Sequence, residues 1–261
     1  MVPFDLDRLR AAPHVAALEY HATLGSTNDR ALELVRTGQV APQTLILAAE
    51  QTAGRGRGGN RWWASPGALT FSYVERLAPT LDRAAWPRWT LVAAVAVCDV
   101  IESLAPDLRP GVRWPNDVHV AGKKISGILV EAPAVAGAQP PLLVLGIGLN
   151  VNNSLAGAPD EVRAVATSLV DLTRQRHDRT DVLLRLLARL QQLTLRLAAQ
   201  DSELVERWQA LCILKGRRVG LRLGEREVLG LCQGIAPDGA LQLDTPAGRE
   251  RFFGGVLTRV E

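Results

Sequence analysis

Residues 112–131 read VRWPNDVHVAGKKISGILVE, and this stretch is the most informative for the predicted fold. Its apolar residues predict short β-strands that meet in a hairpin at Gly122. Two of the chain's three lysines, Lys123 and Lys124, stand side by side at this turn, although the other 27 of the 30 basic residues are arginine. Arginine serves a solvated surface equally well, so we expect at least one of the lysines to supply a compact ammonium charge. A chance pair is the alternative.

Outward from the hairpin, buried strands alternate with helices. Strands are predicted at 44–49, 68–74 and 142–151, and helices between Ser26 and Gly38 and at 88–104, 180–199 and 201–211. After Lys215 the pattern changes to short strands, which are predicted at 218–223, 227–235, 240–243, 251–253 and 256–260. Pro-Asp-Gly and Pro-Ala-Gly turns separate them, and about 45 residues of this kind make a small barrel. The sequence therefore predicts one domain at 1–213 and a second at 214–261.

The composition of the 261-residue chain is that of an ordinary soluble globular protein, with 47% hydrophobic and 22% charged residues. Its three widely spaced cysteines match neither a disulfide framework nor a zinc site, which favours a reducing compartment. The N-terminus lacks the basic start and apolar run of a signal peptide, and no apolar helical stretch is long enough to span a bilayer. These features predict a cytoplasmic protein. The net charge of +3 is too small to establish nucleic-acid binding by itself.

The loop GRGRGGNR at 54–61 follows a predicted strand and formally satisfies the dinucleotide-binding pattern GxGxxG. That fold requires a helix at this point, but the chain continues through Trp62-Trp63 into another strand, so we reject this interpretation. What remains is a glycine-rich backbone with arginines and no acidic residue between Gln51 and Val74. Guanidinium groups bind phosphates and carboxylates bidentately, which suits such a loop to an anionic ligand. The alternative is an exposed turn with solvated arginines, and the glycines argue against it because their ordering is entropically unfavourable.

Further candidate segments have structural alternatives that remain open. GIGLNVN at 146–152 ends a strand with residues that admit close backbone approach, and Asn150 offers a paired donor and acceptor for an adenine edge. A glycine-bearing core strand is the alternative. Ser26-Thr27-Asn28 is explained by a helix cap but also presents uncharged donors to a neutral polar ligand. The four histidines form no metal-ligand pattern and none is assigned to catalysis, and the six tryptophans are interpreted as core or loop anchors.

Taken together, five segments resemble the biotin protein ligase family. The matching signatures are Ser26-Thr27-Asn28, QTAGRGR at 51–57, WPND at 114–117, KISGILVE at 124–131 and GIGLNVN at 146–152. They stand in the order and spacing of the family, and the resemblance runs from about residue 20 almost to the C-terminus. A single motif of this kind is a weak signal, whereas five in order are specific.

The resemblance implies an α/β (α+β) fold in which a mixed-sheet catalytic domain precedes a small SH3-like β-barrel. The catalytic domain is then related to class II aminoacyl-tRNA synthetases and lipoate ligases. The implied activity is that of an enzyme with two half-reactions. Biotin and ATP give biotinyl-5′-AMP and pyrophosphate, and a lysine of a biotin carboxyl carrier protein domain then takes the biotinyl group as an amide. Mg²⁺ is expected with ATP, without assignable protein ligands, so no residue is assigned to a metal.

The resemblance also assigns roles by position. The catalytic positions are Lys124, Asp117 and Arg57. The biotin-binding positions are Ser26, Thr27, Asn28, Gln51, Arg55, Gly56, Arg57, Lys124 and Gly127. The ATP- and adenylate-binding positions are Arg55, Arg57, Asn116, Lys124 and Asn150. Lys124 matches the lysine that contacts the biotin carboxylate and the α-phosphate, and Asp117 matches the aspartate that faces the incoming lysine.

The chain departs from the family pattern in places. Many relatives carry a DNA-binding winged helix before the catalytic domain, and too few residues precede the first match here, so we expect no DNA binding. The doubled Trp62-Trp63 and an extra residue before Ser65 lengthen the loop, so the alignment there is fixed only to within one residue. Arg113 stands where lysine is commoner, and the charge is retained. No membrane partner is expected, and the protein is expected to be a monomer or a weak homodimer.

Two other functions remain open at this point. A lipoate or octanoate ligase shares the architecture, but its acid lacks a ureido ring and its signatures differ at 54–57 and 114–117. A non-enzymatic nucleic-acid-binding regulator would use the basic surface and the small barrel. The sequence shows neither a recognition helix nor an aromatic and basic platform for that role.

Overall fold

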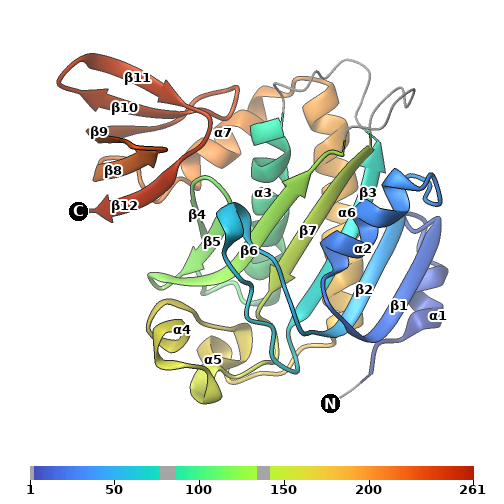
Figure 1. Cartoon of the computed structure of the whole chain (residues 1–261). Coiled ribbons are helices and arrows are strands. Elements are labelled where there is room, and N and C mark those ends of the chain that lie inside the picture. Colours follow the sequence, from blue (N-terminus) through green and yellow to red (C-terminus); the bar gives the residue numbers. More distant parts are fainter. Residues whose placement is uncertain (1–2, 77–85, 134–141) are drawn as a thin grey trace.

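A seven-stranded mixed sheet forms the centre of the larger part of the molecule (Figure 1). The computed structural model describes residues 3–76, 86–133 and 142–261. Across the sheet the strands are β1 (Ala17–Leu24), β2 (Thr44–Gln51), β3 (Leu69–Arg76), β7 (Leu142–Leu149), β6 (Lys123–Glu131), β5 (Asp117–Val120) and β4 (Gly111–Arg113). β1 is parallel to β2, and all the other neighbours are antiparallel. Because β6 pairs with β7, the KISGILVE and GIGLNVN motifs lie side by side.

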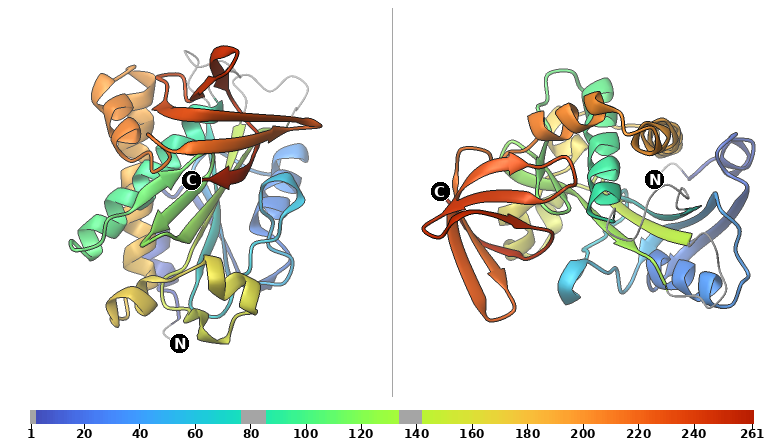
Figure 2. Two further views of the ribbon diagram at one scale, coloured as in Figure 1. Left: turned by 90° about the vertical axis from the view of Figure 1, so that its left-hand side faces the viewer. Right: turned by 90° about the horizontal axis from the view of Figure 1, so that it is seen from above.

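Helices lie on both faces of this sheet (Figure 2). α3 (Trp86–Leu104) and α6 (Arg179–Ala198) pack against each other on one face, over the main hydrophobic core. All residues of α3 from Leu91 to Cys98 are fully buried, as expected for a helix that is apolar on every side. α2 (Thr27–Arg36) packs on the other face against a smaller core that includes Ile46, Val74 and Val144. The shorter helices are α1 (Leu6–Arg10), α4 (Asp160–Val165), α5 (Leu169–Thr173) and α7 (Ser202–Ala210), with 3-10 turns at Arg57–Gly59 (η1) and Leu155–Gly157 (η3).

The C-terminal strands form a separate five-stranded antiparallel sheet. In order they are β11 (Gly248–Phe252), β10 (Leu241–Thr245), β9 (Arg226–Ile235), β8 (Arg218–Leu223) and β12 (Val256–Val260). Two hydrogen bonds tie this unit to the WPND and QTAGRGR motifs. Trp114 Nε1 donates to the Gly239 carbonyl at 3.1 Å, and Arg57 Nη1 donates to the Gly255 carbonyl at 2.6 Å. The second sheet is thus placed directly beside the predicted site.

The fold class predicted from the sequence is confirmed: a mixed α/β sheet domain is followed by a small all-β unit. Besides the hairpin turn at Gly122, the stretch 112–131 contains a second turn, because Arg113 pairs with Asp117 and the residues between them form a turn. Strand β1 and helices α1, α4 and α5 were not predicted from the sequence. β1 lies at the sheet edge with mostly part-exposed residues, so it lacks the continuous apolar run of a buried strand.

Two further predictions concerned disulfide bonds and membrane-spanning helices. Cys98, Cys212 and Cys232 are all buried and free, consistent with the prediction that the chain has no disulfide framework. Among the described residues, none of the helices combines the length and the apolar character that a membrane crossing requires.

Candidate functional site

A cavity of about 350 Å³ opens on the sheet face against which α2 packs. Its floor consists of three glycines on adjacent strands. Gly127 on β6 pairs with Gly148 on β7, and Gly146 lies two residues along β7 on the same face. Because these positions carry no side chain, the surface of the sheet is hollow where α2 begins.

At two of these glycines any side chain would collide with the cavity wall. A Cβ atom at Gly146 would lie 2.0 Å from Asn28 Oδ1, and a Cβ atom at Gly148 would lie 2.4 Å from the Trp62 indole. Both distances are far shorter than the van der Waals contacts that real Cβ atoms make. The glycines of the GIGLNVN motif therefore allow the close packing of Asn28 and Trp62 on the strand, while the ligand-binding interpretation of that segment stays a prediction.

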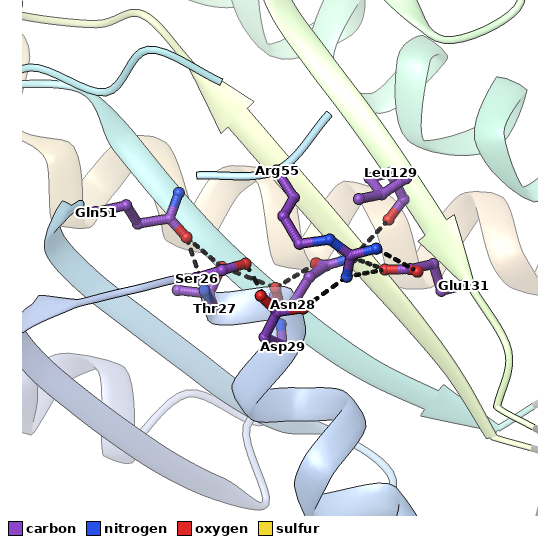
Figure 3. Close-up of polar contacts among 9 residues, drawn as sticks. Ser26, Thr27, Asn28, Asp29, Gln51, Arg55, Leu129 and Glu131 are labelled. Atoms are coloured by element: carbon purple, nitrogen blue, oxygen red, sulfur yellow. Dashed lines mark hydrogen bonds and ion pairs between the residues drawn. The ribbon is translucent and has the colours of Figure 1, made fainter. Parts of the chain in front are cut away.

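Uncharged polar groups line the inner end of the cavity, at the N-terminus of α2 (Figure 3). Gln51 Oε1 accepts hydrogen bonds from the Thr27 backbone N–H at 2.7 Å and from Thr27 Oγ1 at 3.0 Å. Ser72 Oγ lies 2.9 Å from Thr27 Oγ1 and 2.6 Å from Asn28 Oδ1, and Asn28 is only 4% exposed. We call Ser26, Thr27, Asn28 and Gln51, which line the cavity, together with the fully buried Ser72 behind them, the neutral end of the cavity.

Ser26 both caps a helix and lines this cavity. Its Oγ accepts a hydrogen bond from the Asp29 backbone N–H at 3.3 Å, so that α2 begins at Thr27. The cap fixes the direction of the first turn and so holds Thr27 and Asn28 against Ser72. The helix-cap and ligand-binding interpretations of this segment are therefore compatible.

Lys124 reaches the cavity from β6. Its Nζ lies 2.7 Å from Asp117 Oδ1 and 5.8 Å from the centre of the Trp62 ring. Lys123, by contrast, donates to the Arg163 carbonyl and does not line the cavity. The two lysines therefore have different surroundings. Of the two, Lys124, which the resemblance had already assigned to the site, brings its ammonium group to the cavity.

The glycine-rich loop forms one wall of the cavity. The Trp62 backbone N–H donates to the Gly54 carbonyl at 2.9 Å, which closes the loop into a short hairpin. Arg55 bonds to Glu131 at 2.9 and 3.0 Å and to Asp29 at 2.7 Å (Figure 3). The hydrogen bond to Glu131 is the main reason that the pKa of Arg55 is raised above its ordinary value. The loop has no acidic residue of its own, but the fold supplies two.

Arg57 connects this wall to the second sheet. Besides its hydrogen bond to the Gly255 carbonyl, it lines the cavity together with Val256 and Leu257. The outer part of the cavity is therefore bounded by both parts of the molecule. We call Arg55, Arg57, Arg113, Asp117 and Lys124 the charged end of the cavity.

All but one of the predicted site residues line this single cavity. They are Ser26, Thr27, Asn28, Gln51, Arg55, Gly56, Arg57, Asn116, Asp117, Lys124 and Gly127. The exception is Asn150, which is 3% exposed and bonds through Nδ2 to the Thr167 carbonyl and through Oδ1 to Asn153 Nδ2, each at 2.9 Å. Both ends of its amide are engaged where β7 ends, so the structure does not bring Asn150 to the cavity.

The sequence analysis passed over three residues of the site. Ser72 is a polar residue within a buried apolar run, and that contrast was the available signal. Trp62 was interpreted as a core or loop anchor, but its ring covers Gly148 inside the cavity. His119 was not assigned to catalysis, yet it also lines the cavity. No local pattern distinguishes either residue, because their positions depend on how the loop and strand β5 pack.

Comparisons with known proteins agree on one family. Residues 20–150 match the biotin/lipoate A/B protein ligase family, and residues 215–256 match the biotin protein ligase C-terminal domain. A biotin–[acetyl-CoA-carboxylase] ligase from Mycobacterium tuberculosis is 36% identical over 230 residues, which cover 87% of this chain and 83% of that protein. One from Paracoccus denitrificans is 34% identical over 253 residues, covering 90% of this chain and 99% of that protein. The structure of the Aquifex aeolicus biotin protein ligase in complex with biotin and ATP superposes with a TM-score of 0.80, at 28% identity, covering 94% of this chain and 100% of that one.

Proposed function

The chain belongs to the biotin/lipoate A/B protein ligase family, and from that premise we propose that it attaches biotin to a carrier protein in an ATP-dependent reaction. The biotin carboxylate attacks the α-phosphate of ATP, which gives biotinyl-5′-AMP and pyrophosphate. The amine of a carrier lysine then attacks the biotinyl carbonyl carbon, and AMP leaves. The observation that carries the proposal is that one cavity joins a buried neutral end to a charged end.

The neutral end suits the ureido ring of biotin. That ring is uncharged and presents two N–H donors and a carbonyl acceptor. Thr27, Asn28 and Gln51 offer hydroxyl and amide groups that bond to both kinds of atom. A lipoyl or octanoyl chain has no ureido atoms with which to bond to these groups. The neutral end therefore favours biotin over the acids of the related ligases.

The charged end suits the first half-reaction. A carboxylate and a phosphate that approach to about 4 Å repel by about 4 kcal/mol at an effective dielectric constant of about 20. Lys124 is held in the cavity by Asp117, and its ammonium group exchanges this partner for the two anions when the substrates bind. It then stabilises the charge that develops between them, which is the effect expected of a preorganised cation.

The remaining ATP contacts come from the loop. Arg55 and Arg57 hold the phosphates, and Asn116 also lines the cavity. The backbone N–H of Gly56 donates to the Asn60 carbonyl at 2.7 Å and reaches a phosphate only by exchanging that bond. Trp62 offers an aromatic face on which the adenine stacks, an interaction of about 1–3 kcal/mol per base. Asn150 contributes to the nucleotide site only by exchanging its bonds to Thr167 and Asn153 when ATP binds.

In the second half-reaction Asp117 faces the incoming lysine. Once Lys124 has turned to the anhydride, the Asp117 carboxylate is free to bond to the carrier amine and to orient it. Mg²⁺ enters with ATP as part of the nucleotide substrate. The described residues contain no group of three or more histidine, cysteine, aspartate or glutamate side chains that would hold it.

The wider setting follows from the same family. We propose as the partner the biotin carboxyl carrier domain of a carboxylase, for a protein that works as a monomer or weak homodimer without DNA binding. Its free cysteines are consistent with the cytoplasm. We place the domain boundary between residues 213 and 214, a position supported by the family match that starts at residue 215.

Incubation with ATP, biotin and a carrier domain tests the proposal. We expect release of pyrophosphate and a mass increase on the carrier, followed by mass spectrometry. Parallel reactions with lipoate or octanoate serve as controls and are expected to give neither product. Attachment of lipoate without attachment of biotin would show that the assignment of the neutral end is wrong. Tight, salt-sensitive DNA binding without pyrophosphate release would favour the non-enzymatic alternative.

A further inference from the structure

His119 lies beside the two residues that the proposed mechanism uses most. It belongs to β5, two residues after Asp117, and its cross-strand partner on β6 is Lys124, just past a register shift between Val118 and His119. All three side chains line the cavity. His119 is 8% exposed, so the ring is largely shielded from bulk water and faces the site rather than the solvent.

The backbone fixes which nitrogen of the ring is available. His119 Nδ1 lies 3.4 Å from the carbonyl oxygen of Gly122 in the β5–β6 turn. A carbonyl oxygen only accepts hydrogen bonds, so Nδ1 carries the hydrogen in the neutral ring. Nε2 then holds a lone pair and is able to accept a proton.

The surroundings keep the imidazole neutral. Burial is the main reason that the pKa of His119 is lowered, and the positive charges of Arg113 on β4 and Lys124 on β6 lower it further. Asp117 and the bond to the Gly122 carbonyl act in the opposite direction, but they do not reverse the shift. At neutral pH the ring is therefore an unprotonated base, in a cavity where most of the other ionisable groups are cations.

The second half-reaction needs such a base. An alkylammonium group has a reference pKa of about 10.4, so the carrier lysine must lose a proton before or during attack. Among the described residues that line the cavity, Asp117 and His119 are the only side chains that ordinarily accept a proton. Asp117 is paired with Lys124, and a carboxylate is a weaker base than a neutral imidazole.

We propose that His119 takes the proton from the carrier lysine as the amide bond forms, an inference that rests on the proposed ligase function. The amine nitrogen bonds to the biotinyl carbonyl carbon, and the bond from that carbon to the phosphate oxygen of AMP breaks. The carrier ammonium group loses one proton to solvent before attack. As the bond forms, the nitrogen's second excess proton passes to Nε2 of His119, and AMP leaves with the electron pair of the broken bond. The imidazolium returns the proton to solvent after the product departs.

The test separates the two half-reactions of the full-length protein. Pyrophosphate release without carrier measures adenylate formation, and single-turnover transfer from the enzyme-bound adenylate to a carrier domain measures the second step. We expect His119→Gln to slow transfer by about 10²-fold. The loss in the rate of adenylate formation should be at least about tenfold smaller than the loss in the rate of transfer. In the wild type, transfer should rise with pH through a single ionisation below the usual histidine pKa of about 6.5, and this rise should be absent from the variant.

A second variant guards against loss of folding. Added imidazole should restore part of the transfer rate of His119→Ala but not that of Asp117→Asn. The wild-type pH profile needs no variant and tests the proposal even if both histidine substitutions unfold. Equal slowing of both half-reactions, or an unchanged transfer rate, would overturn the role of His119 and leave the ligase function standing. Absence of biotinylation by the wild type would instead contradict the proposed function itself.

Discussion

The neutral end and the charged end of the cavity differ in how they are held before any ligand arrives. At the neutral end, Thr27, Asn28 and Ser72 are at most 4% exposed and bond to one another across α2 and β3. At the charged end, Arg55 and Lys124 are about one third exposed, and each forms an ion pair with a carboxylate of the protein.

The difference follows from the range of the two kinds of interaction. Hydrogen bonds between uncharged groups depend steeply on distance and angle, so a site that recognises a neutral ring needs a rigid, prearranged wall. Charge–charge attraction falls slowly with distance, so cations can exchange one anionic partner for another as substrates enter. Substitutions at the two ends should therefore have different consequences.

The largest effect is expected from Lys124→Ala at the charged end. Adenylate formation should slow by about 10³-fold, because no other ammonium group lies between the reacting anions. Pyrophosphate release under saturating ATP measures the effect, and circular dichroism checks the fold. Lys123→Ala is the matched control, since Lys123 donates to the Arg163 carbonyl outside the cavity. Equal losses in the two variants would contradict the assignment of Lys124.

Gly146→Ala tests whether the neutral end is rigid. The new Cβ would lie 2.0 Å from Asn28 Oδ1, so Asn28 must move and its bond to Ser72 must change. We expect a loss of about 2–3 kcal/mol in biotin affinity, or about 30- to 150-fold, by calorimetry. Gly157→Ala is the control, because a Cβ there meets nothing within 4 Å. Unchanged biotin affinity would show that the neutral end adapts.

Arg57→Ala removes the proposed phosphate contact and the observed bond to the Gly255 carbonyl. The adenylate should dissociate about tenfold faster, because one charge-assisted hydrogen bond is worth about 1.5–3 kcal/mol and water replaces part of it. Stopped-flow release of biotinyl-AMP measures this rate. Arg259→Ala, on the exposed edge of the second sheet, should leave it unchanged. Slower release would contradict a holding role for Arg57.

The smallest effect is expected from Glu131→Gln, which removes a negative charge that competes with ATP for Arg55. Arg55 should exchange its partner more easily, and the KM for ATP should fall about threefold at low salt, with less change at high salt. Asp29 still binds Arg55, which limits the gain. Glu33→Gln serves as the control, since Glu33 pairs with Arg30 away from the cavity. A rise in KM would mean that Glu131 positions Arg55 for the nucleotide instead.

The two ends also differ in how much of each could be predicted from the sequence. At the neutral end, the local pattern of Ser26-Thr27-Asn28 already indicated both a helix cap and uncharged donors, whereas Ser72 was not predicted. At the charged end the residue types were predicted, but their partners were not. The loop lacks acidic residues along the chain, but the fold brings Glu131, 76 residues away, to Arg55.

The sequence by itself determined most of the longer elements and their order, the small C-terminal β unit and five motifs whose residue types fit an anionic and a neutral ligand. These features are local, since periodicity, caps and turn residues act over a few neighbours. Only the tertiary structure decided that Trp62 and His119 line the cavity and that Asn150 bonds elsewhere. The physical reason is that contacts such as that of Arg57 with Gly255, 198 residues away, depend on the packing of the whole chain.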